Sequence, residues 1–204
     1  MMRNALIIFI KYPEPGKVKT RLAKSVGFKR AAEMYRSLVE KNIAEIRPLL
    51  NSTCDCWIAY DPPDYENQMR QWLSDDFSFL SQQGEGLTQR LTNAYSELLS
   101  HGYKSVAVLG SDTLGLRREL IEQTFHRLKT YDIVVGPAKD GGYYLIGMNT
   151  FSSKIFEEIS WSTDKVMAQT LTKIRDLKWD HFLLDELDDL DEIKNVEEPN
   201  IRET

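Results

Sequence analysis

The chain has 204 residues, of which 42% are hydrophobic and 28% charged, and its formal net charge at pH 7 is −5. These values are ordinary for a globular protein, and the length suits a single domain over residues 1–204 whose core needs neither disulfides nor a structural metal. The acidic balance argues against a nucleic-acid binder, and no run reaches the roughly 18 apolar residues that would span a membrane.

Short apolar runs alternate with amphipathic segments along the chain. The expected strands are residues 5–10, 54–60, 77–82, 105–110, 132–137, 143–148 and 181–185. The expected helices, which carry apolar residues at helical spacing, are residues 28–50, 87–100, 117–130 and 163–177. Apolar strands that alternate with such helices are typical of an α/β protein with three α/β/α layers and a mostly parallel sheet.

A basic segment follows the first expected strand. It runs from Phe9 to Ala23 and reads FIKYPEPGKVKTRLA. The residues in it that suit a nucleotide phosphate are Lys11, Gly16, Lys17, Lys19 and Arg21. Glycine lets backbone amides approach a ligand, lysines are mobile point charges, and arginine can bind two phosphate oxygens at once. The segment is not a P-loop, because the first glycine of that motif is missing and Val18 follows Lys17. The alternative to a phosphate site is a solvated basic loop.

The charges are spread unevenly along the chain. Residues 11–30 hold seven Lys or Arg against one acid, whereas residues 185–204 hold nine Asp or Glu against two basic residues. A local basic loop on an acidic protein suits a small anionic ligand better than a long polyanion.

A glycine-rich segment, QGEGLTQRL, precedes the helix expected at 87–100. Gly84 and Gly86 permit close approach of a ligand, and Arg90 lies in the first turns of the helix. The alternative is an ordinary loop with a surface arginine. Further along, Trp161 in SWSTDKV is either a lid over a site or a core residue.

Asp112 stands directly after the apolar strand SVAVLG. Ligands of mostly parallel sheets bind beyond the carboxyl ends of the strands, so this carboxylate should lie at the site. A hard oxygen ligand beside a basic loop suggests Mg²⁺ or Mn²⁺ bridging protein and phosphates. The alternatives are a helix N-cap and a local turn through the Asp112 side chain.

Asp140 lies in a second loop of this kind, AKDGGYY. Gly141 and Gly142 have no Cβ, so a ligand can lie against their backbone, and Asp140 could hold an acceptor hydroxyl or share the metal. The alternative is a plain hairpin turn, for which Asp-Gly is a common sequence.

Cysteine usage favours a cytoplasmic protein. Only Cys54 and Cys56 are present, and two residues this close on a strand have poor geometry for a disulfide. We expect both thiols to be free in a reducing compartment. The sequence contains neither zinc-ligand spacing nor the G-x-S-x-G elbow of a hydrolase.

Taken together, these segments resemble a known family. FIKYPEPGKVKTRLA, QGEGLTQRL, GSDTLGL, GPAKDGGYYLIG and WSTDKVMAQTL resemble, in order, the blocks of bacterial GT-A-like glycosyltransferases associated with radical-SAM and selenium-related domains. That family is similar to the molybdenum-cofactor and 2-phospholactate nucleotidyltransferases. The resemblance extends from about residue 4 to about residue 196, and near its end Asp189 and Asp191 of DLDEIKNV match two Asp positions of nucleotidyltransferases.

The resemblance implies a nucleotide-diphospho-sugar transferase (GT-A-like) fold in which the first loop holds nucleotide phosphates. Lys11, Lys19 and Arg21 match the family's basic positions, and Asp112 matches the Asp that binds the divalent metal in related enzymes. Two positions depart from the family pattern: Leu114 stands where Pro is usual, and Thr88 stands where Gly is usual. Leu114 also occupies the second position of the D-x-D pair of many glycosyltransferases.

We therefore expect a cytoplasmic transferase that uses Mg²⁺ or Mn²⁺, a nucleotide-sugar and an unknown small-molecule acceptor, with Asp140 and Arg90 as the catalytic candidates. Nucleotidyl transfer from a nucleoside triphosphate to a phosphorylated small molecule is the first alternative. The departures at Leu114 and Thr88 motivate a second alternative, a non-catalytic nucleotide-binding module. The sequence leaves open the base, the sugar, the acceptor and whether the chain forms a homo-oligomer.

Overall fold

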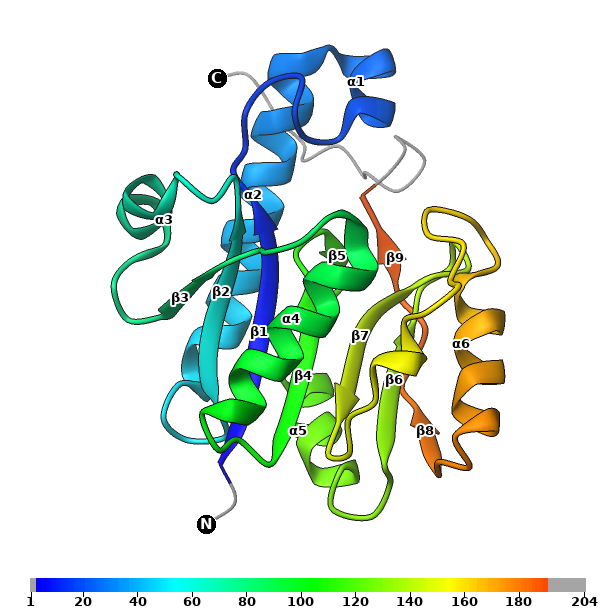
Figure 1. Cartoon of the computed structure of the whole chain (residues 1–204). Helices are drawn as coiled ribbons and strands as arrows, with labels where there is room; N and C mark the ends of the chain where they lie inside the picture. Colours follow the sequence, from blue (N-terminus) through cyan, green and yellow to red (C-terminus); the bar gives the residue numbers. More distant parts are fainter. Residues whose placement is uncertain (1–2, 191–204) are drawn as a thin grey trace.

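The computed structural model describes residues 3–190, which contain a seven-stranded sheet with helices on both faces (Figure 1). The strand order is β3-β2-β1-β4-β7-β6-β8. The strands are β1 Asn4–Lys11, β2 Asp55–Asp61, β3 Ser78–Ser81, β4 Ser105–Gly110, β6 Ile133–Pro137, β7 Tyr143–Met148 and β8 His181–Leu183. Only β7 runs antiparallel to its neighbours in this sheet, so the expected mostly parallel α/β arrangement is confirmed.

Two cores lie on opposite faces of the sheet because successive strand residues point to opposite sides. Leu6 and Ile8 of β1 pack on the side of α2, α3 and α5, while Ala5 and Ile7 pack on the side of α4 and α6. The helices are α2 Phe28–Ile46, α3 Glu66–Leu73, α4 Gly86–Ser100, α5 Arg118–Arg127 and α6 Val166–Asp176. Burial on both faces explains the continuous apolar runs of the central strands.

All the expected strands and helices are present, with small shifts at their ends. The helix expected at 28–50 ends as an α-helix at Ile46 and continues as a 3₁₀ turn through Leu49. The helix expected from residue 163 begins only at Val166. Residues 163–165 instead continue the turn that contains Ser162, whose φ is 62°.

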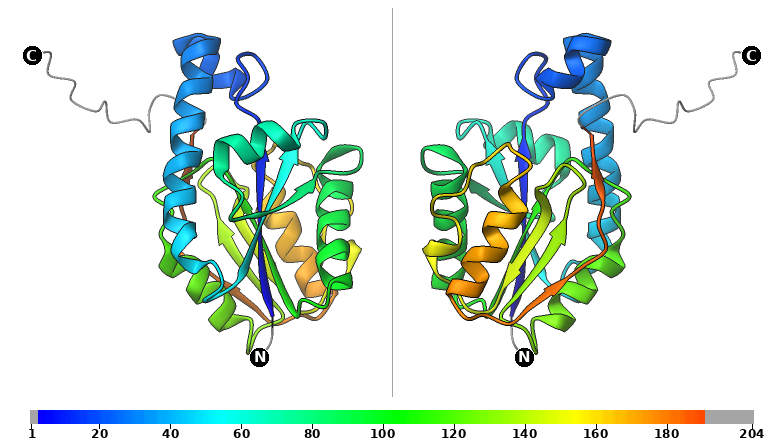
Figure 2. Two further views of the ribbon diagram at one scale, coloured as in Figure 1. Left: turned by 90° about the vertical axis from the view of Figure 1, so that its left-hand side faces the viewer. Right: turned by 90° about the vertical axis from the view of Figure 1, so that its right-hand side faces the viewer.

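A helical hairpin projects beyond the carboxyl edge of the sheet (Figure 2). It consists of α1 (Thr20–Val26) and the first turns of α2, joined at Gly27, whose φ is 82°. The sequence patterns did not predict α1, because its apolar residues Leu22 and Ala23 are too few to define a helical face alone. They are buried only because α2 and Leu190 pack against them.

The end of the described chain crosses the carboxyl edge of the sheet and reaches this hairpin. β9 (Asp188–Asp189) pairs antiparallel with β5 (Thr113–Leu114), and the Leu190 amide donates a hydrogen bond to the Asp112 carbonyl at 3.0 Å. Asp189 therefore lies beside the segment that carries Asp112, whereas Asp191 falls outside the described residues. Within residues 3–190, no helix combines the length and the apolar character needed to cross a membrane.

Candidate functional site

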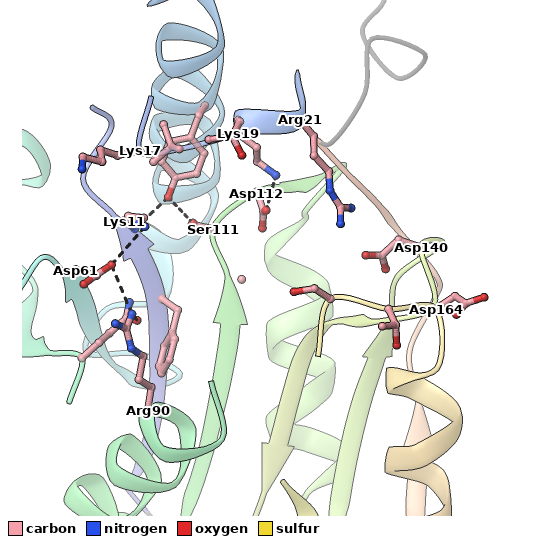
Figure 3. Close-up of a pocket in the computed structure, with 18 residues that line it drawn as sticks. Lys11, Lys17, Lys19, Arg21, Asp61, Arg90, Ser111, Asp112, Asp140 and Asp164 are labelled. Atoms are coloured by element: carbon pink, nitrogen blue, oxygen red, sulfur yellow. Dashed lines mark hydrogen bonds and ion pairs between the residues drawn. The ribbon is translucent and has the colours of Figure 1, made fainter. Parts of the chain in front are cut away.

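A pocket of about 660 Å³ opens at the carboxyl edge of the sheet, between the loops that follow β1, β4 and β6 (Figure 3). The loop before α6 and the first turns of α4 complete its walls. Seven residues predicted from the sequence line it: Lys11, Lys17, Lys19, Arg21, Arg90, Asp112 and Asp140. The structure thus brings together side chains that are up to 129 positions apart in the chain, counting from Lys11 to Asp140 (140 − 11).

The glycines singled out in the sequence do not line this pocket; they are Gly16, Gly84, Gly86, Gly141 and Gly142. Gly16 and Gly86 have φ values of 82° and 72°, so each allows a turn that other residues enter at a cost. Gly141 has a φ of 88°, and a Cβ there would lie 2.4 Å from the Asp164 carbonyl oxygen. The Gly142 amide donates a hydrogen bond to Asp140. Contact of these glycines with a nucleotide stays a prediction.

The basic loop holds its cations in different environments. The Lys17 side chain is exposed, whereas the Lys19 side chain is only 8% exposed and its Nζ lies 2.6 Å from Asp112 Oδ2. Lys19 has a φ of 46° and a ψ of 46°, which a non-glycine residue rarely adopts. Hydrogen bonds shape the turn before it: the Lys17 amide donates to the Glu14 carbonyl, and the Tyr65 hydroxyl donates to Glu14 Oε1.

Tyr35 of α2 joins the basic loop to the loop that carries Asp112. The Lys11 amide donates to the Tyr35 hydroxyl at 3.1 Å, and the same hydroxyl lies 2.8 Å from Ser111 Oγ. Burial raises the pKa of Tyr35 to about 12, so the hydroxyl is neutral at physiological pH. Asn42, two turns further along α2, donates to the carbonyls of Ser111 and Thr113. Helix α2 therefore fixes the two loops relative to each other.

Asp61 forms the other side of the pocket with Lys11 and Arg90. Its Oδ2 lies 3.7 Å from Lys11 Nζ and 3.5 Å from Arg90 Nη1, and its side chain is 15% exposed. Arg90 also donates to Gln82 Oε1 and to the Gly84 carbonyl. Sequence reasoning treated Asp61 only as the end of a strand. The argument that singled out Asp112, a carboxylate directly after a buried strand, applies equally to Asp61.

Asp140 and the loop before α6 face the pocket together. Asp140 Oδ1 accepts a hydrogen bond from the Gly142 amide at 2.8 Å. The hairpin turn, which was the alternative to a role in the site, therefore accounts for one of its two carboxylate oxygens. Asp164 lines the same pocket, and the Met167 amide donates to the Gly141 carbonyl, which fastens the two loops. Asp164 was missed because it follows no strand, and its position depends on the close fit against Gly141.

Thr88 and Leu114, the two departures from the family pattern, have structural contacts. The Trp161 Nε1 donates to Thr88 Oγ1 at 2.8 Å, and this hydroxyl donates to the Phe156 carbonyl. Trp161 is partly buried, packs against the core beside Tyr143, and is not among the residues of the pocket. Leu114 packs against the buried cluster between α1 and α2. Each departure therefore fits a local contact of this chain.

The side chains around Asp112 decide whether a divalent metal ion could be held there. No group of three His, Cys, Asp or Glu side chains within residues 3–190 is arranged to hold a metal ion. Mg²⁺, however, is usually bound through one or two carboxylates plus substrate phosphates and waters. Asp112 offers such a carboxylate, and the ammonium of Lys19 already lies against it. These residues fit a metal that phosphate oxygens help to hold.

The fold is that of the nucleotide-diphospho-sugar transferases and related nucleotidyltransferases. A crystal structure from Desulfovibrio desulfuricans G20, provisionally described as a nucleotide-diphospho-sugar transferase, is 35% identical; the match covers 94% of this chain and 84% of that chain, with a TM-score of 0.87. Residues 47–163 match the family DUF2064, described as an uncharacterized protein conserved in bacteria, and the chain belongs to this family. No curated protein matches the sequence.

More distant structures share the fold alone. Glucosyl-3-phosphoglycerate synthase from Mycobacterium tuberculosis, solved with Mn²⁺, UDP and glucosyl-3-phosphoglycerate, is 10% identical over 92% of this chain and 70% of that chain, with a TM-score of 0.57. The inositol-1-phosphate CTP transferase of T. maritima is 16% identical over 97% and 92% of the two chains, with a TM-score of 0.55. One of these transfers a glycosyl group and the other a nucleotide, so the fold does not choose between the two reactions.

Proposed function

We propose that this protein is a metal-dependent transferase that uses a nucleotide-sugar and passes the glycosyl group to an acceptor. The observation that carries the proposal is the pocket itself, in which Lys17, Lys19 and Arg21 lie with Asp112 at the carboxyl edge of the sheet. The 35% identity to the Desulfovibrio protein, provisionally described as a nucleotide-diphospho-sugar transferase, supports it. The association with radical-SAM and selenium-related domains stays an expectation of the sequence resemblance.

The basic loop has the chemistry to bind the leaving diphosphate. Glycosyl transfer breaks the bond between sugar and phosphate, and negative charge develops on the diphosphate as it leaves. Lys17, Lys19 and Arg21 would hold its oxygens through charge-assisted hydrogen bonds. Asp112 would hold the divalent metal, which neutralises charge on the leaving group when bound. Rate acceleration would come from positioning and electrostatics, because the transfer needs no covalent bond to the protein.

The acceptor would enter beside Asp140 and Asp164. One oxygen of Asp140 accepts from its own turn, and its other oxygen can accept a hydrogen bond from an acceptor hydroxyl. Arg90, the second catalytic candidate, stands across the pocket beside Asp61. We propose that Arg90 orients the nucleotide part of the donor from that side.

Nucleotidyl transfer is the alternative that the same pocket favours. Three cations within residues 17–21 suit a triphosphate as well as a diphosphate, and the CTP transferase of T. maritima shares the fold. An acceptor phosphate would then attack the α-phosphate of a nucleoside triphosphate, and pyrophosphate would leave.

A thermal-shift screen followed by product analysis tests the proposal. Nucleoside di- and triphosphates and nucleotide-sugars are added with and without Mn²⁺, because a ligand that binds the native state raises its melting temperature. A bound nucleotide-sugar that slowly yields a nucleoside diphosphate supports glycosyl transfer, whereas pyrophosphate release from a triphosphate supports the alternative. Binding without turnover would indicate a nucleotide-binding module, and failure of every nucleotide to shift the melting temperature would overturn the proposal.

A further inference from the structure

A cation of the protein itself lies at the Asp112 carboxylate. Lys19 Nζ is 2.6 Å from Asp112 Oδ2, and the dashed line in Figure 3 marks this ion pair. The Lys19 side chain is 8% exposed, whereas the Asp112 side chain is 37% exposed. The ammonium is therefore largely withdrawn from water, while the carboxylate remains open to the pocket.

The backbone around Lys19 holds the ammonium in this position. Val18, directly before it, is buried in the core, and α1 begins directly after it at Thr20. Lys19 itself has a φ of 46°, in the left-handed region that non-glycine residues enter at a cost. The chain thus keeps an unfavourable backbone conformation at the residue whose side chain neutralises Asp112.

The surroundings of Asp112 do not form a complete cage for a free divalent cation. No set of three carboxylate, histidine or cysteine ligands within residues 3–190 converges on one point. A divalent cation at Asp112 therefore needs phosphate oxygens to complete its coordination. A free cation would have to displace the Lys19 ammonium and would find one carboxylate, whereas a cation that carries a polyphosphate supplies the missing ligands itself.

We propose that Lys19 occupies the cation position at Asp112 until the nucleotide arrives, so that the protein binds a divalent cation and a polyphosphate together and does not bind the free cation. On binding, the ammonium moves from the Asp112 carboxylate to phosphate oxygens, and Asp112 becomes a metal ligand. Every charge keeps an opposite partner through this exchange, which avoids leaving a bare carboxylate or ammonium in the pocket. The inference rests on the proposed function and deepens it, because it states that the ligand binds as a complex of a divalent cation with a polyphosphate.

Lys17 provides a matched control on the same loop. It lies two positions before Lys19 and also lines the pocket, but its side chain is exposed and it makes no ion pair with another residue of the described chain. Removal of its charge changes the general field of the loop without opening the Asp112 carboxylate.

Calorimetric titration of the full chain tests the proposal with two probes, Mn²⁺ alone and Mn²⁺ with inorganic pyrophosphate. Pyrophosphate consists of two linked phosphates, the group that nucleoside di- and triphosphates share. Lys19→Met should bind free Mn²⁺ at least about tenfold more tightly than the parent, equivalent to about 1.4 kcal/mol. The same variant should bind Mn²⁺-pyrophosphate more weakly. Lys17→Met should leave the affinity for free Mn²⁺ unchanged. Adding Asp112→Asn to Lys19→Met should abolish the gain.

The titrations can overturn either this inference or the proposed function. The inference is overturned if the parent already binds free Mn²⁺ as tightly as Lys19→Met, or if both Lys19→Met and Lys19→Gln leave that affinity unchanged. If either variant fails to fold, the parent alone still tests the idea, because pyrophosphate must then strengthen Mn²⁺ binding strongly. If neither Mn²⁺-pyrophosphate nor any nucleotide binds the parent, the proposed function itself fails. Binding of these ligands without the effect of Lys19→Met rejects only this inference.

Discussion

Two carboxylates at the carboxyl edge of the sheet, Asp61 and Asp112, are both balanced by cations but in different ways. Asp61 stands between Lys11 and Arg90, at 3.7 and 3.5 Å, and these cations belong to a strand and a helix. Asp112 has Lys19 at 2.6 Å, from a loop residue in the left-handed region. Arg90 is also held by Gln82 and the Gly84 carbonyl, whereas Asp112 faces a single ammonium that a ligand cation can replace.

The burial of the two carboxylates supports this distinction. The Asp61 side chain is 15% exposed and that of Asp112 is 37% exposed. A ligand cation therefore reaches Asp112 more readily, and it has to displace one ammonium rather than two cations. The Asp61 side is suited to holding a neutral or polar part of a ligand, and the Asp112 side to phosphate and metal.

The largest effect should come from Asp112→Asn. The substitution keeps the shape of the side chain but removes the charge that faces Lys19, so Mn²⁺ should no longer strengthen nucleotide binding. We expect turnover to fall by about a hundredfold, as for the loss of one electrostatic contact to a transition state. Nucleotide titrations with and without Mn²⁺ measure the effect.

Asp61→Asn is the matched control for that substitution, since it also removes one carboxylate charge from the same edge. Its partners are Lys11 and Arg90 and not Lys19, so the enhancement of nucleotide binding by Mn²⁺ should survive. Equal loss of Mn²⁺ enhancement in both variants would break the distinction between the two sides of the pocket.

Arg21→Ala should have the next largest effect. The guanidinium can bind two phosphate oxygens, and its loss should weaken nucleotide binding by about 1.5–3 kcal/mol, the range for a hydrogen bond to a charged group. Isothermal titration with the nucleotide identified in the screen measures the change. Unchanged affinity would show that phosphates bind elsewhere, and the Asp112 side would lose its assignment.

Asp140→Asn should lower turnover by at least about tenfold, or about 1.4 kcal/mol in the barrier, with little effect on nucleotide affinity. The reason is that Asp140 would meet the acceptor and not the nucleotide. Asp164→Asn is the comparison, because Asp164 lines the pocket from the adjoining loop. A larger loss of turnover in Asp164→Asn than in Asp140→Asn would move the acceptor-binding role to the residue that sequence reasoning missed.

The sequence predicted most strands and helices well, because their buried residues form continuous apolar runs or recur at helical spacing. SVAVLG and LIIF are apolar on both faces, and α2 repeats its apolar residues at helical spacing. Helix α3, the hairpin helix α1 and the short pair β5–β9 were not predicted, since their burial depends on distant segments: Met69 of α3 packs in the core of the sheet, and α1 packs against Leu190. Such contacts leave no periodic pattern in the segment itself.

The residues of the candidate site likewise include some that the sequence predicted and some that it did not. Charged residues directly after strands, such as Asp112, could be placed at the site because the carboxyl ends of parallel strands meet at one edge. Asp164 could not, because its place depends on the backbone of Gly141 lying against it. The ion pair between Lys19 and Asp112 was also beyond reach, since spacing along the chain does not reveal which cation of a loop turns toward a given carboxylate.

The smallest expected effect concerns Tyr35, which ties the Lys11 side of the pocket to the Ser111–Asp112 side. Tyr35→Phe keeps the ring and removes the hydroxyl, so near pH 8 the free energy of unfolding should fall by about 0.5–1.5 kcal/mol.

The sign of the pH dependence follows from burial, which raises the pKa of Tyr35 to about 12, above the value of about 10 expected in the unfolded chain. The folded state therefore holds this proton more tightly, and the resulting stabilisation is complete below pH 10 and is lost as the pH rises toward 12. Tyr35→Phe lacks this loss, so the stability difference between parent and variant should shrink across that window in urea titrations. Tyr131→Phe, in the turn that follows α5 at the opposite edge of the sheet, is the control. A difference between parent and Tyr35→Phe that stays constant from pH 8 to pH 12 would contradict the raised pKa, and an unchanged free energy of unfolding at pH 8 would show that the hydroxyl does not tie the two sides together.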